Sequence, residues 1–339
     1  MNRRTLIRRV LSGEPSERVP RALFGAGRWL YQQRGLRVER LAEDPEGFAD
    51  ALAEFLEDLD TDIVFPGSGL NTFPAEAIGG ELAFREGQAP LLSGPIIEKT
   101  EDARFLSDIN AADSPQTLAL AVMISRIRKR LPDRFLCATS WGPFTWGMVL
   151  CDWNLLQEKA STDREFIKEV CSLGVRLSAA YFSLLVERNL VDGICISDGA
   201  STLVPGELYA DTILPAEQML FEQFRGRGTT RFLHQCGAIA GQFHRYPETG
   251  ADCITLDAGI DFGEAYRVYG GKVVTAGNVD VVKTVFGGDE AQICEAVTAC
   301  CSAVPRPYRN FILMPSCDLP PETSIGNVKA FLACADRVP

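Results

Sequence analysis

Residues 231–257, RFLHQCGAIAGQFHRYPETGADCITLD, contain two short apolar segments, RFLHQC at 231–236 and CITLD at 253–257. Each segment ends in a polar or thiol side chain, and a turn and a helical pattern follow. Continuous apolar runs of this length are typical of strands that are covered on both faces, as in a parallel sheet. The stretch therefore predicts a repeating unit of strand, turn and helix.

The same alternation of strand, turn and helix is predicted on both sides of this stretch. Further strands are predicted at 19–24, 62–66, 135–141, 192–198, 273–278 and 311–317. Helical patterns lie between the strands at 45–59, 114–130, 163–187, 214–224, 289–303 and 324–335, and Asp289 is a plausible N-cap. Eight strands alternating with helices predict an α/β fold, a single (β/α)8 barrel of the TIM type with an N-terminal helical extension. A hairpin or loop is expected around 82–92.

No long linker rich in Pro, Gly or Ser divides the 339 residues, so we expect one domain over 1–339. The composition, 46% hydrophobic and 23% charged, is that of a globular protein. We expect neither a membrane span nor nucleic-acid binding, since 45 acidic residues outnumber 34 basic ones and phosphate neutralisation needs positive charge.

Chemically useful side chains gather where the predicted strands end: Asp198, His234, Cys236, Asp257, Asn278 and Cys317. In a barrel enzyme that end of the strands carries the active site. His234 and Cys236 are two residues apart on a strand, so both side chains point to one face. Cys317 ends the last strand. An imidazole and two thiolates suit Zn²⁺, and three protein ligands with an open fourth position are typical of a catalytic site.

The other cysteines are expected to be structural. Eleven is an odd number, the residues are scattered through apolar segments, and the sequence shows no signal peptide. We therefore predict a reducing, cytoplasmic location in which most cysteines are buried thiols that pack as small apolar groups. These are Cys137, Cys151, Cys171, Cys195, Cys253, Cys294, Cys300, Cys301 and Cys334.

Taken together, LHQCG (233–237), TGADCITLDAGIDFGEA, GGKVVTAGNVD and FILMPSCDLPPETSIGNVKAFLACA resemble the uroporphyrinogen decarboxylase superfamily. The chain is most similar to its methylcobamide:thiol methyltransferase branch, and the opening TLIRRVLSGEPSERVPRALF is similar to the first helix and strand of that family. The branch has a metal motif H-x-C with a distant C, which His234, Cys236 and Cys317 match. Asp257 stands where a carboxylate falls in the related zinc site of cobalamin-independent methionine synthase.

The resemblance implies a zinc-dependent methyltransferase that acts between a corrinoid and a small thiol. The corrinoid, as methylcobalamin, is expected on a partner protein, because this chain has no Asp-x-His-x-x-Gly segment. Asp198, Asp257 and Asn278 would orient His234, complete the metal shell or contact the corrinoid. Arg28 and Trp141 are candidates for cofactor contact, with core packing as the alternative for the tryptophan.

The sequence differs from the family motifs at three positions near the predicted site. Ser316 replaces the usual Gly before the last zinc cysteine, and Val281 replaces the usual Pro after Gly-Asn-x-Asp. The decarboxylases carry Arg-Gln-Ala-Gly-Arg-Tyr, whereas residues 24–29 read FGAGRW, so Phe24 stands in place of the first arginine.

Two alternative functions stay open. One is a substrate-side methyltransferase (demethylase) that takes a small methyl donor and loads the corrinoid. The other is a cofactor-free decarboxylase-like or non-catalytic member.

Overall fold

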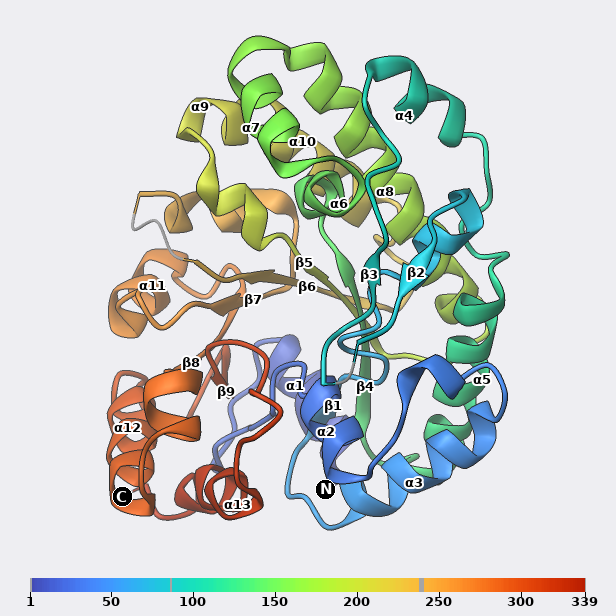
Figure 1. Cartoon of the computed structure of the whole chain (residues 1–339). Coiled ribbons are helices and arrows are strands. Elements are labelled where there is room, and N and C mark those ends of the chain that lie inside the picture. The colour runs from blue at the N-terminus through green and yellow to red at the C-terminus, as the bar shows by residue number, and fades with distance from the viewer. Residues whose placement is uncertain (1, 86, 238–240, 339) are drawn as a thin grey trace.

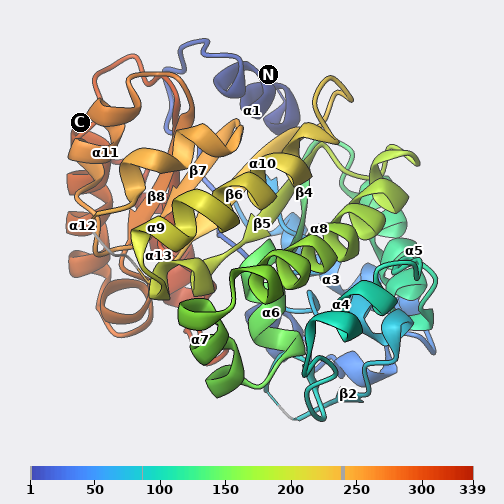
Figure 2. The ribbon, with the colours of Figure 1, turned by 90° about the horizontal axis from the view of Figure 1, so that it is seen from above.

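The computed structural model describes residues 2–85, 87–237 and 241–338. Its centre is a curled sheet of seven parallel strands in the order β1-β4-β5-β6-β7-β8-β9, with helices on the outer side (Figures 1 and 2). These strands are β1 (Ile63–Val64), β4 (Phe135–Trp141), β5 (Gly193–Ser197), β6 (Thr230–Gln235), β7 (Cys253–Leu256), β8 (Val274–Val279) and β9 (Phe311–Pro315).

An eighth extended segment at residues 20–22 closes the barrel. Ala22 N–H donates to the carbonyl of Leu313 on β9 at 2.9 Å, and Asp62 N–H, beside β1, donates to the carbonyl of Arg21 at 2.8 Å. The bridges on both sides are parallel. The predicted eight-stranded barrel is therefore confirmed, with a first strand that is shorter than expected. One domain over the whole chain stays a prediction.

The helices follow the strands as the sequence pattern predicts. Thirteen α-helices flank the barrel within the described residues: α1 (Arg3–Leu11), α2 (Gly27–Gln33), α3 (Pro45–Glu57), α4 (Thr100–Leu106), α5 (Pro115–Arg130), α6 (Pro143–Leu150), α7 (Trp153–Thr162), α8 (Arg164–Val186), α9 (Gly206–Leu208), α10 (Leu214–Glu222), α11 (Phe262–Tyr269), α12 (Glu290–Ser302) and α13 (Ile325–Cys334). The expected hairpin consists of β2 (Leu82–Ala83) and β3 (Leu91–Leu92), which pair antiparallel.

The apolar core has two parts, one between the sheet and the helices and one inside the barrel. Inward side chains of the strands fill the interior, among them Phe135, Phe232 and Met314. Leu6 and Ile7 of α1 belong to the same cluster, so the N-terminal helix covers the end of the barrel where the strands begin. The opposite end, where the strands finish, is left for loops that carry polar side chains.

One helix, α8, is long and apolar enough to cross a membrane by length and composition. Two thirds of its most apolar window (67%) is buried inside the protein. It packs on α6 and α4, and Gly174 allows the backbone of Pro143 on α6 to approach, since a Cβ there would lie 2.6 Å from the Pro143 carbonyl oxygen. We therefore assign α8 to the core of the fold.

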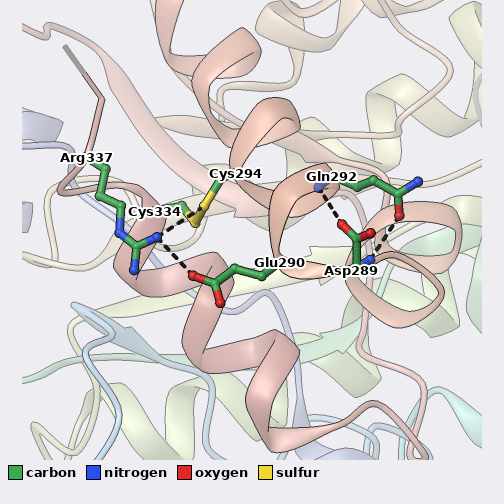
Figure 3. Close-up of a disulfide and its surroundings, with 6 residues drawn as sticks. All are labelled: Asp289, Glu290, Gln292, Cys294, Cys334 and Arg337. Carbon is green, nitrogen blue, oxygen red and sulfur yellow. Dashed lines mark hydrogen bonds and ion pairs between the residues drawn. A yellow bond between two sulfur atoms is a disulfide. The ribbon is translucent and has the colours of Figure 1, made fainter.

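Most cysteines are buried free thiols, as predicted: Cys137, Cys151, Cys171, Cys195, Cys253, Cys300 and Cys301. For Cys294 and Cys334 the prediction of separate thiols is wrong, because a disulfide joins them and ties α12 to α13 (Figure 3). Their helices pack side by side, which only the tertiary structure brings about. Asp289 caps α12 as predicted, in a reciprocal capping box with Gln292 (Figure 3).

Candidate metal centre

Three side chains from two strand ends meet at the mouth of the barrel. His234 lies within β6, Cys236 follows that strand directly, and Cys317 lies two residues beyond β9. Within the residues that the structure describes, these form the one group of three or more His, Cys, Asp or Glu side chains whose ligand atoms all lie within 4.8 Å of one another. The structure thus brings together the three residues that the sequence singled out.

The geometry of this cluster fits a zinc ion. Zn–S bonds of about 2.3 Å and Zn–N bonds of about 2.0–2.1 Å in a tetrahedron place neighbouring ligand atoms roughly 3.6 Å apart. The distance from Cys317 Sγ to His234 Nε2 is 3.7 Å. The donor set of one imidazole and two thiols also matches the preference of Zn²⁺ for nitrogen and sulfur. The three residues therefore fit a metal with an open fourth position.

His234 is held in one orientation by two neighbours. Its Nδ1 lies 2.6 Å from the hydroxyl of Thr255 on β7, and its ring stacks on Phe24 at a centroid distance of 3.9 Å and an interplanar angle of 21°. A nitrogen that binds a metal carries no proton, so a metal on Nε2 would leave the proton on Nδ1, where it would donate to the Thr255 hydroxyl. The orientation that a metal needs is thus already present in the protein chain.

Sequence reasoning missed Thr255 as the hydrogen-bond partner of the histidine. We expected Asp198, Asp257 or Asn278 to orient His234, whereas in the described residues its ring nitrogens pair with Thr255 and Cys317. The signal for Thr255 was the strand register, because His234 pairs with Thr255 across the β6–β7 ladder. Residues directly opposite on parallel strands point to the same face, so a neighbouring hydroxyl could have been found once the strands were aligned.

The two thiols differ in acidity. The hydrogen bond that Cys317 donates lowers the pKa of Cys236, although burial opposes this. The same bond raises the pKa of Cys317, and burial raises it further. Cys236 is therefore the more acidic of the two thiols, and a metal that binds both would displace the proton of Cys317 as well.

Asp257 and Asn278 shape the loops at the rim. The carboxylate of Asp257 accepts from the backbone N–H of Gly237 at 2.8 Å and from that of Gly259 at 2.7 Å, which joins the loops after β6 and β7. Asn278 Nδ2 donates to the carbonyls of Asp257 at 2.9 Å and Ile260 at 2.7 Å. Both side chains are engaged with backbone, and neither contact involves a ligand of the cluster.

Asp198 lies at the end of β5 and is fully buried. Its carboxylate accepts from Thr145 N–H at 2.7 Å, from the Thr145 hydroxyl at 2.8 Å and from Phe144 N–H at 3.3 Å. Burial nevertheless raises the pKa of Asp198, and these hydrogen bonds oppose the rise. The following residue, Gly199, backs the metal cluster: a Cβ there would lie 2.8 Å from Cys236 Sγ.

Arg28 and Trp141 occupy different parts of the mouth. Arg28 Nε lies 3.6 Å from a carboxylate oxygen of Asp318, the neighbour of Cys317. The arginine also lines a cavity of about 780 Å³ with Tyr31 and Phe84, among others. Trp141 ends β4, is half-buried and donates from Nε1 to the Thr72 hydroxyl at 3.2 Å. Arg28 thus links the cavity to the strand end that carries Cys317.

Comparison with known proteins places the chain among enzymes of this fold. The family model described as uroporphyrinogen decarboxylase (URO-D) matches residues 2–338. The uroporphyrinogen decarboxylase of Rhizorhabdus wittichii is 26% identical over 317 residues, which cover 88% of this chain and 89% of that protein. That of Legionella pneumophila (strain Lens) is 24% identical over 293 residues and covers 81% of each. A solved methyltransferase from Methanosarcina mazei superposes with a TM-score of 0.85, at 19% identity, over 99% of both chains.

Proposed function

The chain belongs to the uroporphyrinogen decarboxylase family, which indicates an enzyme, and we propose that it is a zinc-dependent methyltransferase. In this proposal a methyl group moves between a corrinoid, presented as methylcobalamin by a partner protein, and a small thiol. The solved structure with the same fold is named a methyltransferase, which is compatible with this reaction class. The cytoplasmic location is part of the same proposal.

One observation carries the proposal, namely the cluster of His234, Cys236 and Cys317 at the mouth of the barrel. A bound Zn²⁺ would lower the pKa of a coordinated substrate thiol, so that the thiolate is available near neutral pH. The protein supplies the rest: Thr255 and Phe24 hold the imidazole, and the fourth position is open toward the substrate. Holding the thiol in line with the methyl group would then provide much of the rate enhancement.

A second observation argues against decarboxylation of a porphyrinogen. The decarboxylases place an arginine where this chain has Phe24, and here that ring stacks on His234. Phe24 therefore supports the imidazole of His234 at the position where the decarboxylases have an arginine. A substrate with many carboxylates needs several arginine partners, and the loss of one weakens its recognition.

The remaining candidate residues have supporting roles in this proposal. Arg28 and the cavity of about 780 Å³ are suited to bind the part of a substrate or of the corrinoid that does not react. Asp257 and Asn278 hold the rim loops, and Trp141 borders the mouth. Asp257 would become a fourth ligand only if its carboxylate left the two backbone N–H groups that it now accepts from.

The test measures metal content and methyl transfer together. We expect about one zinc per chain and the appearance of Co(I) when purified protein is mixed with methylcobalamin and a suitable thiol from a panel. Cys317→Ser should lose the metal and the activity, whereas the matched variant Cys151→Ser, at a buried free thiol outside the cluster, should keep both.

The assay also has outcomes that reject the proposal. Protein that contains no zinc and takes up none would overturn it. Conversion of uroporphyrinogen to coproporphyrinogen at enzymatic rates would assign the chain to the decarboxylases instead. Methyl transfer from a small donor to Co(I), without transfer to any thiol, would favour the substrate-side methyltransferase.

A further inference from the structure

Glu217, on α10, is a buried carboxyl group with no part in the reaction described so far. Its side chain is fully buried, and so is that of Asp198. The two carboxyl groups lie close enough to interact electrostatically. Two neighbouring buried carboxylates repel each other, and burying an unpaired charge is costly, so one of the two groups holds a proton. Since Asp198 already accepts from Thr145 and Phe144, the proton belongs to Glu217.

The titration behaviour agrees with this assignment. Burial raises the pKa of Glu217 well above its ordinary value, and the nearby charge of Asp198 raises it further. Tyr209 donates its hydroxyl to Glu217 Oε2 at 2.9 Å. A neutral Glu217 places no second charge beside Asp198 and accepts the hydrogen bond of Tyr209.

The second contact of Glu217 reaches the strand that carries the metal ligands. Gln235 lies between His234 and Cys236, so its side chain points to the opposite face of β6. Its Nε2 donates to Glu217 Oε1 at 3.1 Å, and its Oε1 lies 3.2 Å from the hydroxyl of Ser201. The amide of Gln235 is buried and held at both ends.

The backbone of Asp198 also contacts the strand that carries His234 and Cys236. Asp198 N–H donates to the carbonyl of His234 at 3.1 Å. The Ser201 hydroxyl lies 2.6 Å from the Asp198 carbonyl, and Gly199 between them backs the Cys236 thiol. Asp198 and Ser201 therefore join the turn after β5 to β6, the strand that carries His234.

We propose that Glu217 is a positioning residue for the metal centre, which acts through Gln235 to fix the strand segment carrying His234 and Cys236. This inference rests on the proposed metal site. Partners of metal ligands typically change metal affinity by about 10–100-fold when they are mutated. Glu217 touches none of the three ligand side chains, so its effect should appear as a change in ligand geometry.

The experiment uses Co²⁺ as a spectroscopic replacement for Zn²⁺ in the full chain. Co²⁺ bound by thiolates and imidazole has visible absorption bands that report the coordination geometry. Glu217→Leu removes the acceptor for Gln235 and for Tyr209, and we expect altered bands and an affinity about 10–100-fold weaker. Glu217→Gln can still accept from Gln235, so it should retain the parent spectrum. Thr212→Val is the matched control, because the buried Thr212 hydroxyl has no hydrogen-bond partner among the residues that the structure describes.

A double variant tests whether Glu217 acts through Gln235. If it does, adding Glu217→Leu to Gln235→Leu should weaken Co²⁺ binding by less than Glu217→Leu does alone. Gln235→Leu leaves the carboxyl pair intact and keeps the test possible if Glu217→Leu does not fold. Parent-like spectra and affinities in Glu217→Leu, or in Gln235→Leu, would overturn the inference while leaving the metal site intact. Failure of the parent protein to take up Co²⁺ or Zn²⁺ would instead reject the metal site, and this inference with it.

Discussion

Replacing Thr255 by valine tests the idea that the barrel itself fixes the metal-binding nitrogen of His234. Valine has nearly the shape of threonine but lacks the hydroxyl that lies 2.6 Å from Nδ1. Both residues are buried, His234 at 2% and Thr255 at 1% exposure, so water does not replace the lost hydrogen bond. In the variant, Nδ1–H is left without an acceptor, and the proton moves to Nε2, where it competes with the metal.

The expected magnitude follows from that lost hydrogen bond. An unsatisfied buried donor costs about 1–3 kcal/mol, and 1.4 kcal/mol corresponds to a tenfold change in an equilibrium constant. The metal-bound form needs the proton on Nδ1, so it bears this cost, whereas the metal-free form avoids part of it by changing tautomer. We therefore expect Thr255→Val to bind Zn²⁺ roughly tenfold more weakly, which agrees with the effect of other partners of metal ligands.

The assay is competition for Zn²⁺ against a chromophoric chelator, with the unfolding free energy measured in parallel. Thr275→Val is the matched control: Thr275 lies on the neighbouring strand β8, is buried at 1% exposure, and its hydroxyl has no hydrogen-bond partner in the described part of the chain. That variant should bind Zn²⁺ as the parent does. Equal affinity in the parent and Thr255→Val would refute the reasoning, and so would an equal loss in both variants.

Three further outcomes are expected. Asp257→Asn should keep its zinc but lower the unfolding free energy by about 1 kcal/mol, because one of two backbone N–H groups loses its acceptor; loss of zinc would show instead that Asp257 is a ligand. Asp192→Asn should cost about 3 kcal/mol in urea unfolding at pH 7, since it breaks a buried ion pair with Arg128. Burial alone would raise the pKa of Asp192, but Arg128 and other donors hold this pKa below its ordinary value. The stabilisation by the ion pair is therefore present above about pH 4 and is lost as the pH falls through the folded-state pKa. An equal difference in unfolding free energy between the parent and Asp192→Asn at pH 7 and at pH 2 would contradict this. Replacing Cys294 and Cys334 together by serine should lower the unfolding free energy by up to about 4 kcal/mol, the value for a closed loop spanning 40 residues, and should abolish any effect of reductant on the unfolding midpoint.

The barrel and the three ligands of the candidate site could be predicted from the sequence. Strand β4 was predicted at its observed limits, residues 135–141, and the other strands of the sheet within three residues at either end. A buried strand can be recognised from its own residues, because a short apolar run between turns has few other ways to bury its side chains. The H-x-C spacing is equally local, since the alternation of a strand alone puts His234 and Cys236 on one face.

The partners of those ligands were decided by the tertiary structure. Thr255 contacts His234 through the register of two strands, and Phe24 reaches the imidazole through closure of the barrel by the N-terminal segment. The disulfide between Cys294 and Cys334 needed two helices to pack side by side. The hydrogen bond between Gln235 and Glu217 likewise needed α10 to pack beside β6. A strand is specified by its own side chains, whereas the partner of a buried polar group is set by how separate elements pack, and no local pattern in the sequence records that distance.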